Sequence, residues 1–84
     1  MYKVKKKDGR EEDFDRSKLV NSVLSAGGKQ EEAEKVAAEV EAWLPTVAVN
    51  GLVDSQAIRS KVLEVLKPLS PVVADKFEAY KKQV

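Results

Sequence analysis

The 84-residue sequence contains neither cysteine nor histidine. These two absences exclude disulfide bonds, thiolate nucleophiles, imidazole bases and the usual zinc sites. No apolar run approaches the roughly 18 residues of a membrane span. The basic start leads into acidic residues and not into the apolar core of a signal peptide. We therefore expect a cytoplasmic protein that does not associate with a membrane.

The composition that remains is typical of a folded protein. Hydrophobic residues make up 43% of the chain, and the formal net charge is +1. A chain of this length buries roughly 60% of the surface that it exposes when unfolded, which is enough for one domain to fold without disulfide bonds or bound metals. No internal repeat, linker or low-complexity tract divides the sequence. We predict that residues 1–84 form one domain.

The first arm of the chain has the pattern of a β-hairpin. Asp8-Gly9 is a hairpin signal, and we expect a tight turn of the primed type, which requires positive φ. Because strand side chains alternate, Tyr2 and Val4 should lie on one side and Lys3, Lys5 and Lys7 on the other. The opening basic run KVKKK is thus predicted to be a strand.

Two helices are predicted next. Asp15 is a suitable N-cap for a helix whose apolar residues share one face and which Gly27-Gly28 ends. A second helix should run from about Gln30 to Leu44, with Glu31 and Glu32 in its first turn, and Pro45 should end it.

The second half predicts a short strand and two more helices. After the loop TVAVNG, Leu52-Val53 has the pattern of a strand, and Asp54 or Ser55 should cap a third helix that Pro68 closes. Ser70-Pro71 has the N-cap and first-turn proline of a fourth helix. We predict an α+β fold, a bundle of about four helices capped by an N-terminal hairpin, with three strands if Leu52-Val53 joins the sheet.

The sequence offers little support for catalysis. Most of its carboxylates are spread along helix faces beside lysines and arginines, whereas an acid/base pair must converge on one pocket. There is no Walker-type loop and no GxGxxG motif, and Gly27-Gly28 is explained as a helix terminus. The opening lysines leave three interpretations: a solvated edge strand, a nucleic-acid surface or a site for a small anion. The near-neutral charge and the lack of aromatic residues among the lysines count against nucleic acid.

The order of the residues resembles a known family. The string VKKKDGREEDFDRSKL is similar to the start of the ATP-cone domain, the nucleotide-sensing module of ribonucleotide reductases and of the bacterial repressor of their genes. The family pattern is V-x-K-R-x-G-x, a short polar stretch, an apolar residue, Asp and then Lys. Downstream, LVDSQAIRSKVLEVL and PVVADKFEAYKK resemble two further segments of the family. Matching residues are Val4, Lys6, Lys7, Gly9, Phe14, Asp15 and Lys18.

The resemblance implies a site for ATP or dATP, with or without Mg²⁺, beneath the hairpin. By analogy with the family, Val4 would contact the base or sugar, and Lys6, Lys7 and Lys18 would neutralise the phosphates. Glu12 matches a position that hydrogen-bonds the nucleotide. Ser55 and Arg59 match positions that line the base and ribose.

Each assignment has a plain structural alternative. Val4 could be hairpin core, Ser55 only a helix cap, and Arg59 only the partner of a nearby acid. Lys6 and Lys7 are adjacent and should point to opposite faces of a strand, so Lys6, on the side of Val4, is the stronger candidate. Aromatic residues assigned to the core are Trp43, Phe77 and Tyr80.

The chain departs from the family in two respects. Lys7 stands where the family usually has Arg, which removes a bidentate donor and leaves a point charge. No catalytic domain and no cysteine-based zinc module accompany the cone, so it stands alone or belongs to something larger.

These patterns predict a non-catalytic regulatory module that binds an adenine nucleotide. Its partner would be a second copy of the chain or a regulated protein. The alternatives are a degenerate cone that serves as an interaction domain and, third, a nucleic-acid binder.

Overall fold

The computed structural model describes the backbone of residues 2–82 and the side chains of residues 2–79. Within that range the fold is α+β, as predicted. Tyr80, assigned to the core above, has its side chain outside the described residues. The elements in chain order are β1 (Lys3–Lys5), β2 (Glu11–Asp13), α1 (Arg16–Ser25), α2 (Gln30–Val47), β3 (Leu52–Asp54), α3 (Ser55–Leu69) and α4 (Pro71–Lys82).

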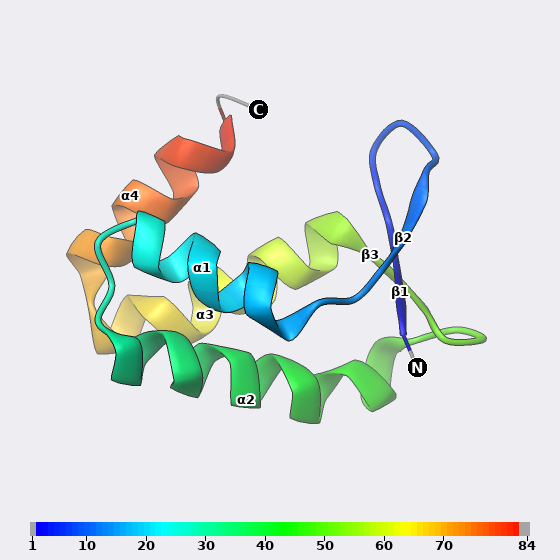
Figure 1. Cartoon of the computed structure of the whole chain (residues 1–84), viewed down its shortest axis with the longest axis horizontal. Coiled ribbons are helices and arrows are strands. Elements are labelled where there is room, and N and C mark those ends of the chain that lie inside the picture. Colours follow the sequence, from blue (N-terminus) through cyan, green and yellow to red (C-terminus); the bar gives the residue numbers. More distant parts are fainter. Residues whose placement is uncertain (1, 83–84) are drawn as a thin grey trace.

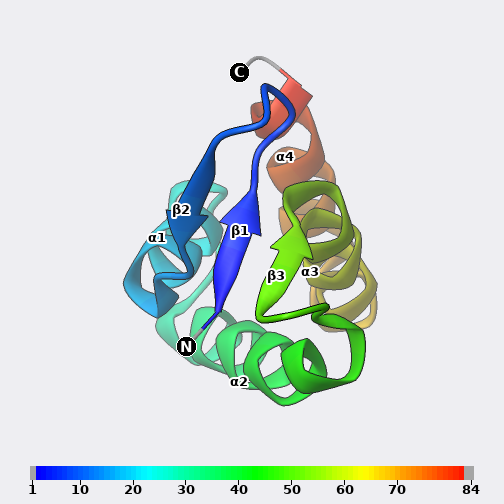
Figure 2. The same cartoon turned by 90° about the vertical axis from the view of Figure 1, so that its right-hand side faces the viewer.

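The three strands form one small sheet at an end of the helical bundle (Figure 1). Their order is β2-β1-β3, seen face-on in Figure 2, with β1 antiparallel to β2 and parallel to β3. The predicted third strand is therefore confirmed. The register places Val4 between Glu12 and Val53, and these positions share the face that looks toward the helices.

The opposite face of the sheet carries a pattern of alternating charge. Lys3 lies opposite Asp13, and the Lys3 Nζ is 3.1 Å from the Asp13 Oδ1. Lys5 lies between Glu11 on one side and Asp54 on the other. All five side chains are exposed. Because acids flank the lysines on this face, it does not present the continuous positive surface that nucleic acids need.

The hairpin turn differs from the expected primed type. The Lys6 carbonyl accepts a hydrogen bond from the Gly9 N–H at 3.0 Å, and the Lys6 N–H donates to the Arg10 carbonyl at 2.8 Å. In the described chain Gly9 has positive φ, +91°, but Asp8 does not. This is a three-residue loop with glycine at the left-handed position. The primed pattern occurs instead at Asn50-Gly51, where φ is 54° and 77°.

Gly9→Val is expected to destabilise the protein by about 1–2 kcal/mol and to weaken ligand binding beneath the hairpin. An added Cβ at Gly9 would meet nothing within 4 Å, so the penalty comes from the positive φ alone. Gly9→Asn is the matched control because asparagine tolerates this conformation. Urea unfolding should rank the parent, Asn and Val proteins in that order. Equal stability of all three would show that the turn does not require glycine.

Side-chain caps begin three of the helices, as predicted. Asp15 Oδ1 accepts from the Ser17 N–H at 2.9 Å at the start of α1, and Asp54 Oδ1 accepts from the Gln56 N–H at 2.8 Å at the start of α3. Ser70 caps α4 through a longer contact of 3.4 Å. Local chemistry therefore fixes where these helices begin.

Two prolines do not end their helices where the sequence suggested. α2 continues past Pro45 to Val47, and α3 continues past Pro68 to Leu69. A proline removes one N–H donor and leaves the carbonyl four residues earlier without its partner. Those carbonyls belong to Glu41 and Glu64, which are exposed, so water can replace the missing bond.

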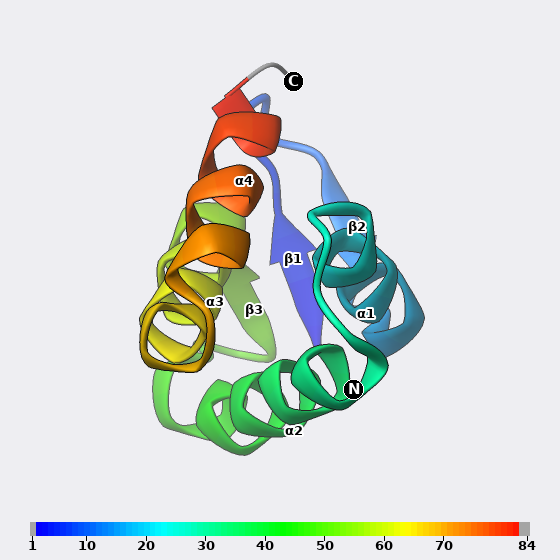
Figure 3. The ribbon, with the colours of Figure 1, turned by 90° about the vertical axis from the view of Figure 1, so that its left-hand side faces the viewer.

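The core lies between the four helices and the inner face of the sheet. Figure 3 shows α2 across one side, α1 and the α3–α4 pair on the flanks, and the sheet behind them. Phe77 is 1% exposed and is the largest side chain among the fully buried residues. Trp43 is half-buried and packs against this core, as expected. The buried apolar residues are Leu19, Val20, Val23, Ala26, Ala33, Val36, Ala37, Val40, Leu44, Val53, Val62, Leu66, Val73, Ala74 and Phe77.

Candidate functional site

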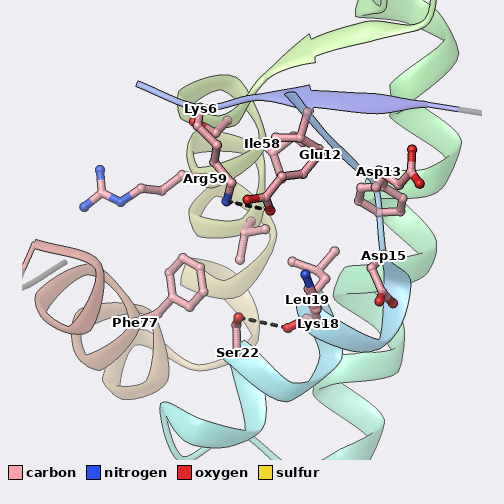
Figure 4. A pocket seen from close by; sticks show the side chains of 14 residues that line it. Lys6, Glu12, Asp13, Asp15, Lys18, Leu19, Ser22, Ile58, Arg59 and Phe77 are labelled. Atoms are coloured by element: carbon pink, nitrogen blue, oxygen red, sulfur yellow. Dashed lines mark hydrogen bonds and ion pairs between the residues drawn. The ribbon is translucent and has the colours of Figure 1, made fainter. Parts of the chain in front are cut away.

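A pocket opens between the inner face of the hairpin and the helices (Figure 4). The hairpin forms its roof, α1 and α3 form its two walls, and Phe77 reaches it from α4. Its cavity has a volume of about 130 Å³. Residues from five elements thus meet at one place, although they are spread from position 4 to position 77 of the chain.

Six of the seven predicted site residues line this pocket: Val4, Lys6, Glu12, Lys18, Ser55 and Arg59. The seventh, Lys7, is exposed in the hairpin turn and is not among the lining residues. Alternation along the strand explains the difference between the neighbours, since Lys6 follows Val4 on the inner face. The structure therefore separates the two members of the basic pair.

Sequence reasoning missed eight lining residues, most of which come from helices or flank α1. They were detectable in principle from helical spacing. Positions 15, 18, 19 and 22 share one face of the first helix, and positions 55, 58, 59 and 62 share one face of the third. Extending each predicted site residue along its own helix would have found most of them. The missed residues are Asp13, Phe14, Asp15, Leu19, Ser22, Ile58, Val62 and Phe77.

The interior of the pocket is apolar and its mouth is charged. Leu19, Val62 and Phe77 are buried, and Ile58 is half-buried against the same core. At the mouth, the Lys6 Nζ lies 3.9 Å from the Glu12 Oε1, and their side chains are 40% and 39% exposed. This is a long, partly solvated ion pair, so Lys6 remains available to another anion.

Lys18 enters the pocket from the first turn of α1. Figure 4 shows its side chain rising from the helix toward the hairpin. No carboxylate of the described residues lies within 4.0 Å of its amine, although Glu12, Asp13 and Asp15 also line the pocket. A cation at the positive end of a helix is unfavourable on its own. Its position is better explained by an anion than by stability of the helix.

Ser55 does not serve as a helix cap, and Arg59 does not pair with an acid of the described residues, so neither residue has the structural role considered above. Asp54, and not Ser55, is the N-cap of α3, so the Ser55 hydroxyl is not used as a cap. Arg59 has no carboxylate partner within 4.0 Å among the described residues. Its Nη2 lies 3.4 Å from the Glu78 carbonyl, and its Nε is buried without a hydrogen-bond partner. A buried donor of a cationic group that lacks an acceptor is an unusual feature.

Among the described side chains, those of residues 2–79, no three His, Cys, Asp or Glu gather as a metal site requires. Within the same range, no helix combines the length and apolar character that crossing a membrane demands. Lysines and an arginine facing an apolar cavity suit a ligand with an aromatic part and an anionic part. Fold and pocket together define a small ligand-binding domain, in which a three-stranded sheet covers a four-helix bundle.

Comparison with known families identifies the domain. The model of the ATP cone domain matches residues 2–83, nearly the whole chain. The protein belongs to the ATP-cone family, whose members are regulatory modules that bind adenine nucleotides. It is also similar to an uncharacterized protein of Archaeoglobus fulgidus, at 50% identity over 40 residues, which span 48% of this chain and 85% of that protein.

Proposed function

We propose that the pocket binds ATP or dATP, and that the chain acts as a non-catalytic regulatory module. The observation that carries this proposal is the meeting of Lys6, Lys18 and Arg59 at the mouth of an apolar cavity. Two of these cations have no carboxylate partner in the described part of the chain. A nucleotide supplies both an aromatic base for the cavity and phosphates for the cations.

The size of the cavity limits how the nucleotide sits. Pockets that enclose a drug-sized ligand measure about 300–1,000 Å³. The cavity measures about 130 Å³, so the enclosed part is suited to the base alone. Val4, Leu19 and Ile58 would contact the base, while the ribose and phosphates occupy the open mouth. Glu12 is an acceptor-only group when ionised, and this suits the hydroxyl groups of a ribose.

Lys7 has a smaller part in this proposal than in the family pattern. Its side chain is exposed and belongs to the turn beyond β1. A solvated charge at that position attracts a triphosphate through long-range forces, which salt screens. Direct phosphate contact by Lys7 stays a prediction. Mg²⁺ bound by the phosphates themselves is compatible with the proposed site.

Nucleotide binding would act by population shift. The hairpin pairs with the rest of the domain through the short β1–β3 ladder, and the ligand would touch both the hairpin and the helices. Any arrangement that brings these parts together is stabilised by the binding free energy. The favoured arrangement would then alter the surface seen by a second copy of the chain or by a regulated protein.

Calorimetric titration with ATP, dATP, adenosine and a single-stranded oligonucleotide tests this function. We expect saturable binding of ATP or dATP near one per chain, with weaker binding of adenosine. No binding of any of the four ligands would favour the degenerate cone. Preference for the oligonucleotide with a steep salt dependence would favour the nucleic-acid binder.

Lys18→Ala is expected to weaken ATP binding about tenfold or more without lowering stability. The reason is that Lys18 opposes the helix dipole in the first turn of α1 and has no ion pair among the described residues. Lys35→Ala, an exposed charge on α2, is the control for net charge. A clear fall in melting temperature for Lys18→Ala would assign this lysine a structural pairing instead.

A further inference from the structure

Arg59 differs from the other two arginines of the chain in having no carboxylate partner among the described residues. The Arg10 Nε lies 2.7 Å from the Asp8 Oδ2, and Arg16 pairs with Glu34 at 3.0 Å and with Glu41 at 2.9 Å. The Arg16 pairing also lowers the pKa of Glu34 below its usual value through their hydrogen bond. Among the described residues, the arginine without a carboxylate partner is the one that lines the pocket.

The N–H donors of Arg59 make few good hydrogen bonds in the described structure. Its contact with the Glu78 carbonyl is 3.4 Å long, beyond the 2.7–3.2 Å that is usual for an N–H donor. Its Nε is buried and has no acceptor. Leaving a buried donor unsatisfied is unfavourable, and a planar guanidinium is shaped to bind the oxygens of a phosphate in a fork. Both facts favour an anionic ligand as the missing acceptor.

The arrangement of charges gives the bound nucleotide a direction. In Figure 4, Asp13 and Asp15 lie at one end of the pocket and Arg59 lies toward the end where α4 enters, while Lys18 and the Lys6–Glu12 pair lie between them. Phosphates are repelled by the carboxylates and attracted by the cations. These charges favour a triphosphate that extends from the cavity toward α4, with its terminal phosphates near the guanidinium of Arg59.

We propose that Arg59 binds the terminal phosphates and makes the site select nucleotides by their number of phosphates. This assignment rests on the proposed function and replaces the base or ribose contact that the family resemblance implied for this position. The fork of Arg59 supplies the bidentate contact that Lys7 cannot make. On this assignment AMP and adenosine, which lack the terminal phosphates, gain nothing from Arg59.

The test compares ATP, ADP, AMP and adenosine by calorimetry in the parent, Arg59→Gln and Arg59→Lys proteins. We expect Arg59→Gln to weaken ATP binding about tenfold to a hundredfold, ADP less, and adenosine hardly at all. Arg59→Lys keeps the charge and the aliphatic stem but loses the fork, so its ATP affinity should fall between the other two. Arg10→Gln, which removes the same charge from the exposed turn, is the control and should change all four ligands little.

Each other outcome identifies what failed. A parent protein that binds ATP, combined with equal losses for all four ligands in Arg59→Gln, would overturn the selective role and make Arg59 a support of the fold. If Arg10→Gln weakens ATP binding as much as Arg59→Gln does, the effect comes from the change in net charge and not from the position of Arg59. A parent protein that binds neither ATP nor adenosine would instead overturn the proposed function itself. Because Arg59→Lys retains the packing of the stem, it supplies the measurement if Arg59→Gln does not fold.

Discussion

Replacing Phe77 by alanine is expected to lower the free energy of unfolding by about 3–5 kcal/mol, the largest effect of any substitution considered. The ring is 1% exposed and packs within the core between the helices. Its removal leaves a cavity that neighbouring helices fill only in part. Domains of this size are stable by about 5–15 kcal/mol in total, so the loss is a large fraction of the whole.

Urea unfolding of Phe77→Ala and of Val72→Ala, two positions on the same helix, measures this contribution. Val72 is 63% exposed, so its truncation should have little effect. Phe77 also ends the pocket at α4, and Phe77→Ala should therefore weaken ATP binding even where the protein remains folded. Equal and small losses from both substitutions would show that α4 does not anchor the bundle through this ring.

Lys6→Ala is expected to weaken ATP binding by about 1.5–3 kcal/mol, the range of a hydrogen bond to a charged group. Its amine lines the pocket and has one long contact, at 3.9 Å, with the Glu12 carboxylate. Adenosine, which has no phosphate, should lose far less. The ATP affinity of the parent should also fall as salt rises, because a partly exposed charge is screened.

Lys7→Ala is the matched control. It removes the same charge at the neighbouring position, and the Lys7 side chain does not line the pocket. Its effect on ATP should be several times smaller than that of Lys6→Ala. Lys7→Arg restores the residue usual in the family and is expected to maintain or strengthen triphosphate binding. If Lys6→Ala loses ATP, ADP and adenosine equally, the lysine supports the hairpin and not a phosphate.

Most of the secondary structure could be predicted because the signals are local. Asp15, Asp54 and Ser70 each accept a hydrogen bond from a backbone N–H two or three residues away. The start of each of these helices is therefore determined by a few neighbouring residues. Pro45 and Pro68 were wrongly predicted to end their helices, because the prediction assumed that a helix cannot continue past the hydrogen bond that a proline removes. Solvent can replace that bond on the exposed side of a last turn.

The position of the hairpin turn was predicted correctly, but its type was not. Asp8-Gly9 and Asn50-Gly51 have similar sequence signals, yet the second has positive φ at both residues and the first at glycine alone. The number of residues between paired strands selects the turn, and the pairing is set by the sheet. In this protein the sheet register includes β3, which is distant in sequence from the hairpin.

The α+β class, the hairpin, the helix starts and the inward side of β1 are predictable from the sequence, because these features depend on spacing and on neighbours in the chain. Which cations share a pocket depends instead on how the elements pack in three dimensions. This packing placed Lys6, Lys18 and Arg59 around one cavity and left Lys7 outside it. Within the part of the chain that the structure describes, it gave Arg10 and Arg16 carboxylate partners and left Arg59 without one. The physical reason is that helix packing and sheet register fix the distances between residues far apart in sequence, and no local pattern encodes those distances.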